Sequence, residues 1–225
     1  GFINMLSWGY SSLMEDGRSL SDLKQGVTLE VFGEGVSPGP YVRDGERYSF
    51  KEAMEALENS GVSTNIASFL GATTARMMEV GFENRPATEN EMQKMREMVK
   101  QSMEEGAMGI GSSLIYAPAD YAPTEELIEL CKVASEKGGM YISHMRNEDN
   151  LLMEALEELI TISRDADIPA EIYHLKASRE VNWHMLDSLI KRVEQVREEG
   201  LEITADIYTY NASSTGLTGV IPTWV

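Results

Sequence analysis

Short apolar and β-branched runs alternate along the chain with longer amphipathic segments. The apolar runs predict strands over Gly1 to Met5, Val27 to Phe32, Ser63 to Phe69, Ala107 to Ser112, Met140 to His144, Ala170 to Leu175 and Leu201 to Tyr208. The amphipathic segments predict helices over Leu20 to Gln25, Phe50 to Ser60, Glu89 to Glu105, Glu125 to Lys137, Asn150 to Asp165 and Trp183 to Glu199. Strands that alternate with helices in this way are typical of a parallel sheet built from βαβ units.

Signals at the helix ends support this division. Thr88 followed by Glu91 forms a capping-box pattern, and Gly106, Gly138 and Gly200 stand where three helices are expected to end. The series predicts an α/β protein with an incomplete (β/α)8 TIM-type barrel, one strand short of closure. We therefore expect a single barrel domain over residues 1–225, truncated at both ends. A doubly wound open sheet is the alternative, but no glycine-rich phosphate turn follows the first strands.

Composition narrows the classes of partner. The chain has 225 residues, 42% of them hydrophobic, which is enough for one sizeable core. Its 19 basic and 37 acidic residues give a net charge of -18, which argues against binding to nucleic acid or to anionic membranes. Cys131 is the single cysteine and cannot form an internal disulfide. We expect a soluble, cytoplasmic protein that acts on small molecules and can form oligomers. Because the sequence begins with Gly1 rather than methionine, a segment upstream of it stays possible.

Two of the three histidines lie at the ends of consecutive predicted strands. His144 ends one strand and His174 lies near the end of the next. The carboxyl ends of parallel strands share one edge of a barrel, and catalytic groups gather there. Because neutral imidazole is the commonest protein ligand of transition metals, the matching positions favour a metal site over two core histidines. His184 begins a helix, and we expect it to be partly exposed and outside the site.

A carboxylate follows the second predicted strand at the same edge. Glu34 stands on a turn between Gly33 and Gly35. It can complete a three-ligand set with the two histidines, leaving a fourth position open for water, as catalytic zinc sites require. From the residues alone, a solvated loop glutamate is the favoured interpretation in so acidic a protein.

Cationic side chains also follow these strand ends, despite the acidic character of the whole chain. Arg146 lies just beyond His144, and Lys176 lies two residues beyond His174. Either cation suits a substrate carboxylate, although a surface pair between Arg146 and Glu148 is the alternative for the arginine. The further candidates for substrate hydrogen bonds are Tyr208, Tyr210, Ser113 and Tyr116. A packed aromatic pair is the alternative for the first two tyrosines.

Six ordered segments resemble the N-acyl-D-amino-acid deacylase (D-aminoacylase) family of the amidohydrolase superfamily. They are GFIN, GVTLEVFGEG, EEGAMGIGSSLIYAPADYAPTEELIEL, YISHMRNE, IYHLKAS and ADIYTY, and they run through nearly the whole chain. The resemblance implies a (β/α)8 barrel, usually with a small β domain built from both chain ends. It also implies hydrolysis of the amide of an N-acyl-D-amino acid, which releases a carboxylic acid and a D-amino acid. The β domain and the eighth strand have no counterpart in the sequence.

The resemblance assigns roles to the candidate residues. His144 and His174 match the family's two strand-end zinc histidines, and Glu34 falls where members have a cysteine or an acidic bridging ligand. The segments that contact substrate in the family contain Arg146, Lys176, Tyr208 and Tyr210.

Two departures from the family pattern change the expected chemistry. The superfamily's first strand ordinarily ends in a His-x-His pair, but this chain has Leu6 and Trp8 at those places. We therefore expect one Zn²⁺ ion rather than two. The catalytic aspartate of the eighth strand is expected beyond the chain end, so the sequence offers no candidate for the general base.

Two other functions stay open from the sequence. A barrel of this kind could act on a cyclic amide, as hydantoinase-like or dihydroorotase-like enzymes do, although the missing first-strand histidines speak against this. Alternatively, the barrel could be a non-catalytic relative that binds a small ligand.

Overall fold

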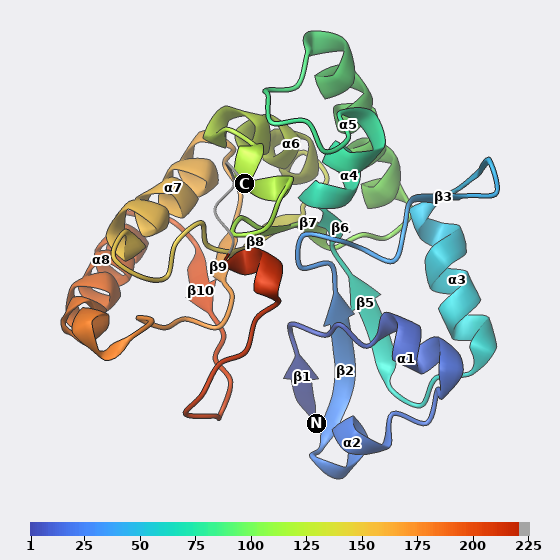
Figure 1. Cartoon of the computed structure of the whole chain (residues 1–225), viewed down its shortest axis with the longest axis horizontal. Coiled ribbons are helices and arrows are strands. Elements are labelled where there is room, and N and C mark those ends of the chain that lie inside the picture. The colour runs from blue at the N-terminus through green and yellow to red at the C-terminus, as the bar shows by residue number, and fades with distance from the viewer. Residues whose placement is uncertain (221–225) are drawn as a thin grey trace.

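Short parallel strands form the inner layer of the part of the molecule that the structure describes. The computed structural model describes residues 1–220 (Figure 1). One parallel sheet has the order β1-β2-β5, with strands Phe2–Asn4, Val27–Phe32 and Asn65–Ser68. A second has the order β10-β9-β8-β7-β6, with strands Ile203–Ala205, Ala170–Ile172, Met140–His144, Gly109–Ser113 and Leu70–Gly71.

The two sheets are consecutive parts of one curved series. Phe69 lies between β5 and β6, and its N–H donates to the Phe32 carbonyl at 2.9 Å, while the N–H of Met108 donates to the Ser68 carbonyl at 3.0 Å. β5 and β6 are therefore two parts of one strand segment, which pairs with β2 through β5 and with β7 through β6. Within residues 1–220 no pairing joins β1 to β10, so the strands form an arc, as Figure 1 shows.

The strand order excludes the doubly wound alternative. Spatial order follows chain order from β1 to β10, whereas a doubly wound sheet reverses its order at a switch point. The α/β class and the incomplete barrel predicted from the sequence are confirmed.

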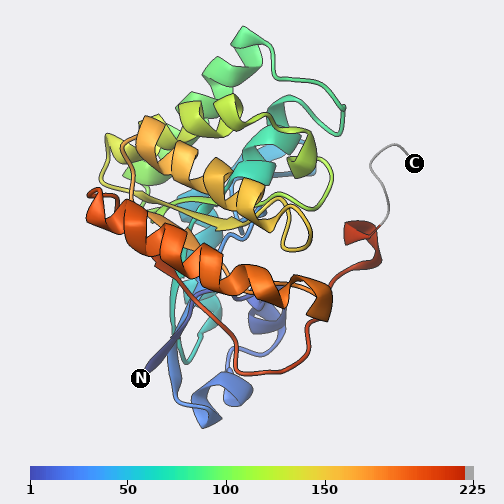
Figure 2. The same cartoon turned by 90° about the vertical axis from the view of Figure 1, so that its left-hand side faces the viewer.

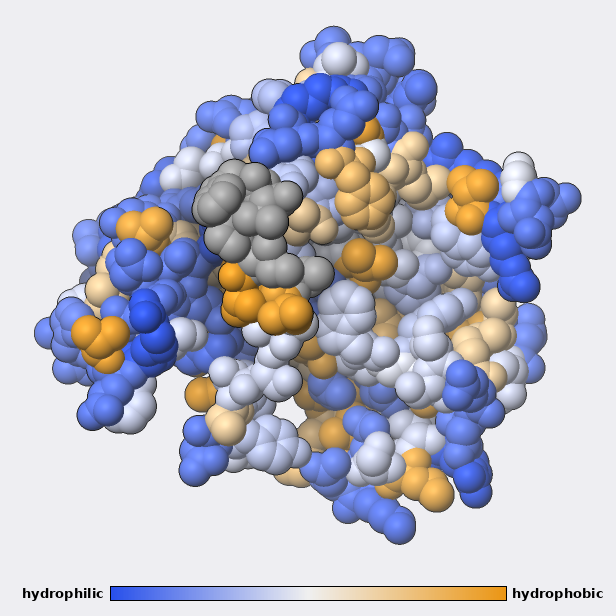
Figure 3. Space-filling model, viewed as in Figure 1, coloured by the Kyte–Doolittle hydropathy of each residue, from blue (hydrophilic) through white to orange (hydrophobic). Residues whose placement is uncertain are grey.

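Helices cover the outer side of the arc. They are α3 (Phe50–Ser60), α4 (Ala72–Glu79), α5 (Glu89–Glu104), α6 (Thr124–Ser135), α7 (Leu152–Asp165) and α8 (Leu186–Glu198). Figure 2 shows α7 and α8 running side by side, and Figure 3 shows mostly hydrophilic residues on the outer helices. The main core lies between these helices and the strands, where Met95, Leu130 and Leu156 are fully buried. None of the helices within residues 1–220 is both long and apolar enough to cross a membrane.

Helix starts follow the capping signals. Thr88 accepts a hydrogen bond from the Glu91 N–H, and the Glu91 side chain accepts one from the Thr88 N–H, as the sequence predicts. Ser49 and Glu52 form the same reciprocal pair at the start of α3. Each pair satisfies backbone donors that the first helical turn leaves without a partner.

Several short elements are missing from the sequence prediction. They are α1 (Tyr10–Glu15), α4, and the antiparallel hairpin of β3 (Tyr41–Arg43) and β4 (Glu46–Tyr48). Residues 72–76 of α4 are all buried although Thr73, Thr74 and Arg76 are polar, so the buried side of this helix is not marked by apolar residues in the sequence. The hairpin turns at Asp44 and Gly45, both with positive φ. Asp-Gly is a hairpin signal, but it is a signal of turn residues rather than of hydrophobic periodicity.

Other elements are shorter than predicted. Residues 180–185, partly inside the predicted helix from Trp183, form the 3-10 helix η2 (Glu180–Met185), and α8 begins only after it. The predicted strand over Leu201 to Tyr208 is reduced to β10. β10 lies at the edge of its sheet, and β9 is its only paired neighbour within residues 1–220. A strand with one neighbour has fewer backbone hydrogen bonds to hold its ends.

A buried ion pair joins α4 to α6. The Arg76 guanidinium donates to both Glu126 carboxylate oxygens, at 2.7 and 2.9 Å, and both side chains are almost fully buried. Replacing Glu126 by alanine leaves a buried cation without its anion, so we expect the free energy of unfolding to fall by about 3–5 kcal/mol. The control Glu125→Ala removes an exposed carboxylate from the same turn and should change it by about 0.5 kcal/mol or less. Urea unfolding followed by circular dichroism measures both, and equal stability of the two variants would contradict this role.

Candidate metal centre

Three possible ligand atoms meet at the carboxyl edge of the strands. Glu34 follows β2, His144 ends β8 and His174 follows β9. Glu34 Oε1 lies 2.8 Å from His144 Nδ1 and 3.8 Å from His174 Nε2, and the two nitrogens are 3.1 Å apart. Ligands of a tetrahedral zinc ion with bonds near 2.05 Å are separated by about 3.3 Å. The three atoms therefore fit around one ion of this size and can hold it.

Unusual backbone conformations place two of these side chains. Gly33 has φ 104°, and a Cβ there would lie 2.5 Å from the Phe69 carbonyl oxygen, so only glycine fits this turn before Glu34. His174 has φ 36°, and its N–H donates to Asp206 Oδ1 at 2.6 Å. A left-handed residue other than glycine is strained by about 1–2 kcal/mol, and this hydrogen bond helps to hold it.

The Glu34 carboxylate is buried among donors. Trp8 Nε1 donates to Oε2 at 2.6 Å, and Ser113 Oγ donates to Oε1 at 3.4 Å. Burial alone would raise the pKa of Glu34, but the hydrogen bonds with His144, His174 and Trp8 lower it to about 2. The carboxylate is therefore ionised at neutral pH, as a metal ligand must be.

Without a metal ion, the His174 imidazole is positively charged at neutral pH because its pKa is raised. Burial would lower its pKa, but hydrogen bonds and charge interactions with Glu148 and Glu34 raise the pKa to about 9. A metal ion that binds through Nε2 must displace this proton.

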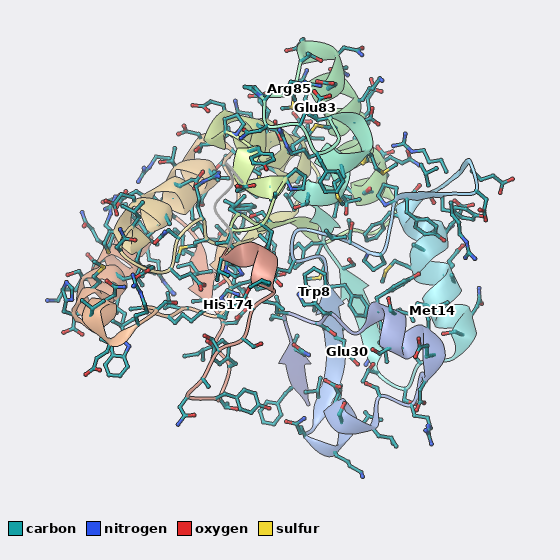
Figure 4. The ribbon with its side chains drawn as sticks, in the orientation of Figure 1. Trp8, Met14, Glu30, Glu83, Arg85 and His174 are labelled. Carbon is teal, nitrogen blue, oxygen red and sulfur yellow. The ribbon has the colours of Figure 1, made fainter. Side chains whose placement is uncertain are left out.

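A cavity on the inner side of the arc, about 1340 Å³ in volume, opens beside the three atoms. Its lining includes His144, His174, Lys176, Tyr208 and Tyr210. Figure 4 shows Trp8 and His174, from distant parts of the chain, near the middle of the molecule. The ion would therefore face a space that can admit a small molecule.

The predicted substrate residues differ in their contacts and in their exposure. Lys176 Nζ donates to Glu148 Oε1 at 2.8 Å and lies 5.5 Å from the centre of the Tyr208 ring. The side chain of Tyr210 is mostly exposed. The ring of Tyr116 lies edge-on to His144, with 6.0 Å between the ring centres.

Arg146 also lines the cavity, but its donors are already engaged. Its guanidinium donates to both Glu158 carboxylate oxygens and to the carbonyls of Asp120 and Ala122. The alternative of a pair with Glu148 is wrong, because Glu148 instead pairs with Lys176, on the loop after β9. An Arg146 contact with substrate would require some of these bonds to break.

Two residues that lie around the centre are missing from the predicted site, and His184, which the prediction left out, lies apart from it. Trp8 entered only as the residue in place of a histidine, yet its indole contacts Glu34 directly. Asp206 supports the His174 backbone and was considered only as a neighbour of the tyrosines. His184 lies on η2, exposed, with Nδ1 beside the Val181 carbonyl, and takes no part in the cluster.

Comparison with known proteins identifies the relatives of this chain. No family model matches the sequence. Over 96% of its length, the chain is 31% identical to a D-aminoacylase from Alcaligenes xylosoxydans xylosoxydans. It aligns with TM-score 0.86 and 27% identity, over 93% of its length, to an N-acyl-D-glutamate deacylase from Bordetella bronchiseptica, complexed with zinc and a phosphonate inhibitor. This chain belongs to the D-aminoacylase family of amidohydrolases.

Other comparisons show how much of its relatives this chain covers and how similar their folds are. A D-aminoacylase structure described as having a binuclear metal centre, with one-metal activation and second-metal attenuation, aligns with TM-score 0.86 and 29% identity over 93% of the chain. The chain spans about half of these relatives, namely 48% of the Alcaligenes enzyme and 47% of each of the two structures. A D-hydantoinase aligns over 91% of the chain with TM-score 0.52 and 10% identity, which shows a shared fold alone.

The pKa of His174 predicts that zinc binding at these three residues depends on pH. Because the pKa of His174 is about 9 without metal, a proton competes with the metal at neutral pH, and raising the pH removes that competitor. We expect the apparent zinc affinity to rise about tenfold per pH unit between pH 6.5 and 8.5. Glu34, ionised throughout this range, should add nothing to the slope.

Competition with a chelator of known affinity measures the slope, and calorimetry in two buffers of different ionisation enthalpy counts the protons released. Zinc affinity that stays constant across this range, with no proton release, would contradict a protonated His174.

Proposed function

We propose that this chain provides the metal-binding part of a zinc-dependent deacylase that hydrolyses the amide bond of N-acyl-D-amino acids. The observation that carries this proposal is the convergence of Glu34 Oε1, His144 Nδ1 and His174 Nε2 on one point. The named activities of the relatives, D-aminoacylase and N-acyl-D-glutamate deacylase, supply the substrate class. We also propose that the protein acts in the cytoplasm on small molecules, which fits the charge of -18 and the lone cysteine.

Glu34, His144 and His174 would hold the ion. Zinc, when bound there, polarises the scissile carbonyl and lowers the pKa of a coordinated water toward neutrality. Two neutral imidazoles and one carboxylate would leave a bound Zn²⁺ with a net charge of +1, and three protein ligands would leave room for water. The family resemblance assigns the general base to an aspartate of an eighth strand, outside the 225 residues.

A single ion is the form that these residues support. Trp8 Nε1 donates to Glu34 Oε2 at 2.6 Å, so this oxygen already has a partner, and only Oε1 faces the histidines. Leu6 offers no ligand atom to a second ion. One ion is sufficient for such chemistry in a relative, because the D-aminoacylase with a binuclear centre is described as activated by one metal and attenuated by the second.

Lys176 is the cation that we assign to the substrate carboxylate. It lies on the loop that follows His174, beside Tyr208 at the cavity, and its Nζ donates to Glu148 and to the His174 carbonyl. The guanidinium of Arg146 is held by more bonds, to Glu158 and to two carbonyls, so Lys176 has fewer bonds to give up to a substrate carboxylate. An anion bound by Lys176 would place the chiral carbon next to the metal centre, and this positioning accelerates attack on the adjacent amide. Tyr208, Tyr210, Ser113 and Tyr116 stay secondary candidates for hydrogen bonds to substrate.

A non-catalytic barrel is the second candidate, and one observation favours it. Leu6 and Trp8 follow the first strand, where the superfamily ordinarily has two histidines, so the chain lacks that pair. A cyclic-amide hydrolase has weaker support, because the D-hydantoinase shares only the fold.

Zinc content and deacylase activity test the proposal together. We expect the full-length protein to contain close to one zinc ion per chain by elemental analysis, and to hydrolyse N-acetyl-D-amino acids faster than hydantoins. The double variant His144→Ala, His174→Ala should lose the metal and at least about a thousandfold in activity, because the Lewis acid is removed. His184→Ala, on the exposed η2, is the matched control and should keep both.

Each outcome decides between the candidates. A wild-type protein that stays free of metal after purification with zinc supplied would overturn the deacylase and favour the non-catalytic barrel. Stoichiometric zinc with activity on hydantoins alone would favour the cyclic-amide hydrolase.

A further inference from the structure

The two histidines turn opposite sides of their rings toward two different carboxylates. His144 Nδ1 and His174 Nε2 face Glu34, as described above. The other nitrogen of each ring faces Glu148, with His174 Nδ1 2.9 Å from Oε1 and His144 Nε2 3.7 Å from Oε2. Glu148 thus lies behind both imidazoles, on the side away from the candidate metal position.

The nitrogens on that side need an acceptor when metal is bound. A neutral imidazole that binds metal through one nitrogen carries its proton on the other. His144 Nε2 is buried and has no hydrogen-bond partner among residues 1–220. A movement of about 0.7 Å would bring it within hydrogen-bond length of Glu148 Oε2. One carboxylate can therefore accept from both rings, with one oxygen for each.

Lys176 cannot take this role. Its Nζ lies 2.8 Å from His174 Nδ1, but an ammonium group only donates, so it cannot accept the proton that this nitrogen carries once Nε2 binds metal. Glu148, which also accepts from Lys176 at 2.8 Å, is the acceptor on this side of His174.

Backbone and side-chain contacts hold Glu148 in place. Its carbonyl accepts from the Ser178 N–H at 2.7 Å, which ties the loop after β8 to the loop after β9. The neighbouring Asp149 pairs with Arg179 and accepts from Asn182 on the same second loop. These bonds join the loops that follow His144 and His174, so the carboxylate is anchored to the segments that carry both rings.

We infer that Glu148 is a positioning residue that orients both histidines and fixes which nitrogen of each binds the metal. This inference rests on the proposed zinc site and extends it to a residue outside the candidate ligand set. A carboxylate behind a ligating histidine fixes its tautomer and strengthens it as a ligand, and losing such a partner typically costs 10–100-fold in metal affinity. Glu148 would do this for two ligands at once.

Zinc affinity of full-length variants, measured by chelator competition, tests this role. We expect Glu148→Ala to bind zinc about 10–100-fold more weakly than wild type. Glu148→Gln has nearly the same size but a single accepting oxygen, so it can serve one ring only and should also bind more weakly. Glu154→Gln makes the same change of charge at an exposed position on α7 and should bind as wild type.

A second measurement separates positioning from a merely structural role. In the zinc-bound wild type, proton NMR should show two slowly exchanging ring N–H signals, from His144 Nε2 and His174 Nδ1. We expect Glu148→Gln to lose or broaden at least one of them while keeping the urea midpoint of the metal-free protein.

The outcomes distinguish this inference from the proposed function. Wild type that binds zinc tightly, with Glu148→Ala and Glu148→Gln within twofold of it, would overturn the role of Glu148 and leave the zinc site standing. Weaker zinc binding with both ring signals intact and a lowered urea midpoint would assign Glu148 to structure instead. Wild type without zinc would overturn both.

Discussion

The buried carboxylate of Glu34 is a side-chain contact that links the two parts of the strand series at the candidate metal centre. It follows β2, in the first sheet, and reaches His144, His174 and Ser113 on the second, while its other oxygen accepts from Trp8 after β1. An ionised carboxylate is costly to bury unless donors surround it. The site therefore depends on donors from four chain segments, and each loses a partner if Glu34 is removed.

Strand order explains how so few residues make a site. Parallel strands that follow chain order bring their carboxyl ends to one edge, so residues 34, 144 and 174 meet although they lie far apart in sequence. The backbone then sets the direction of each side chain. Glycine at position 33 allows the turn into Glu34, and Asp206 holds His174 in the left-handed conformation that aims its ring at the cavity.

The sequence predicts those features that depend on local pattern. Apolar runs locate the central strands, and capping residues such as Thr88 locate helix starts, because each signal lies within a few residues of the feature it predicts. The two strand-end histidines and Glu34 could be grouped for the same reason, since their place relative to a strand determines the edge on which they lie.

Partner choice among long side chains could not be predicted in this way. Arg146 bonds to Glu158 on α7 rather than to Glu148, two residues away, and that preference depends on how α7 packs. Likewise, Trp8 reads as a lost ligand in sequence, and only the three-dimensional arrangement shows its N–H on Glu34.

The charge of the whole molecule and the individual charges beside the candidate metal centre act on a substrate over different distances. A net charge of -18 repels an anion far from the cavity, but at physiological ionic strength such repulsion is screened beyond about 8 Å. Inside the cavity, Lys176 and a bound zinc ion would be the positive charges nearest to the substrate. Because Lys176 already shares Glu148 with His174, an incoming carboxylate would compete with Glu148 for the lysine. Binding of the proposed substrate would then release Glu148 to accept more fully from the histidines, so under the inferred role Glu148 would couple the metal ligands to the substrate's charge.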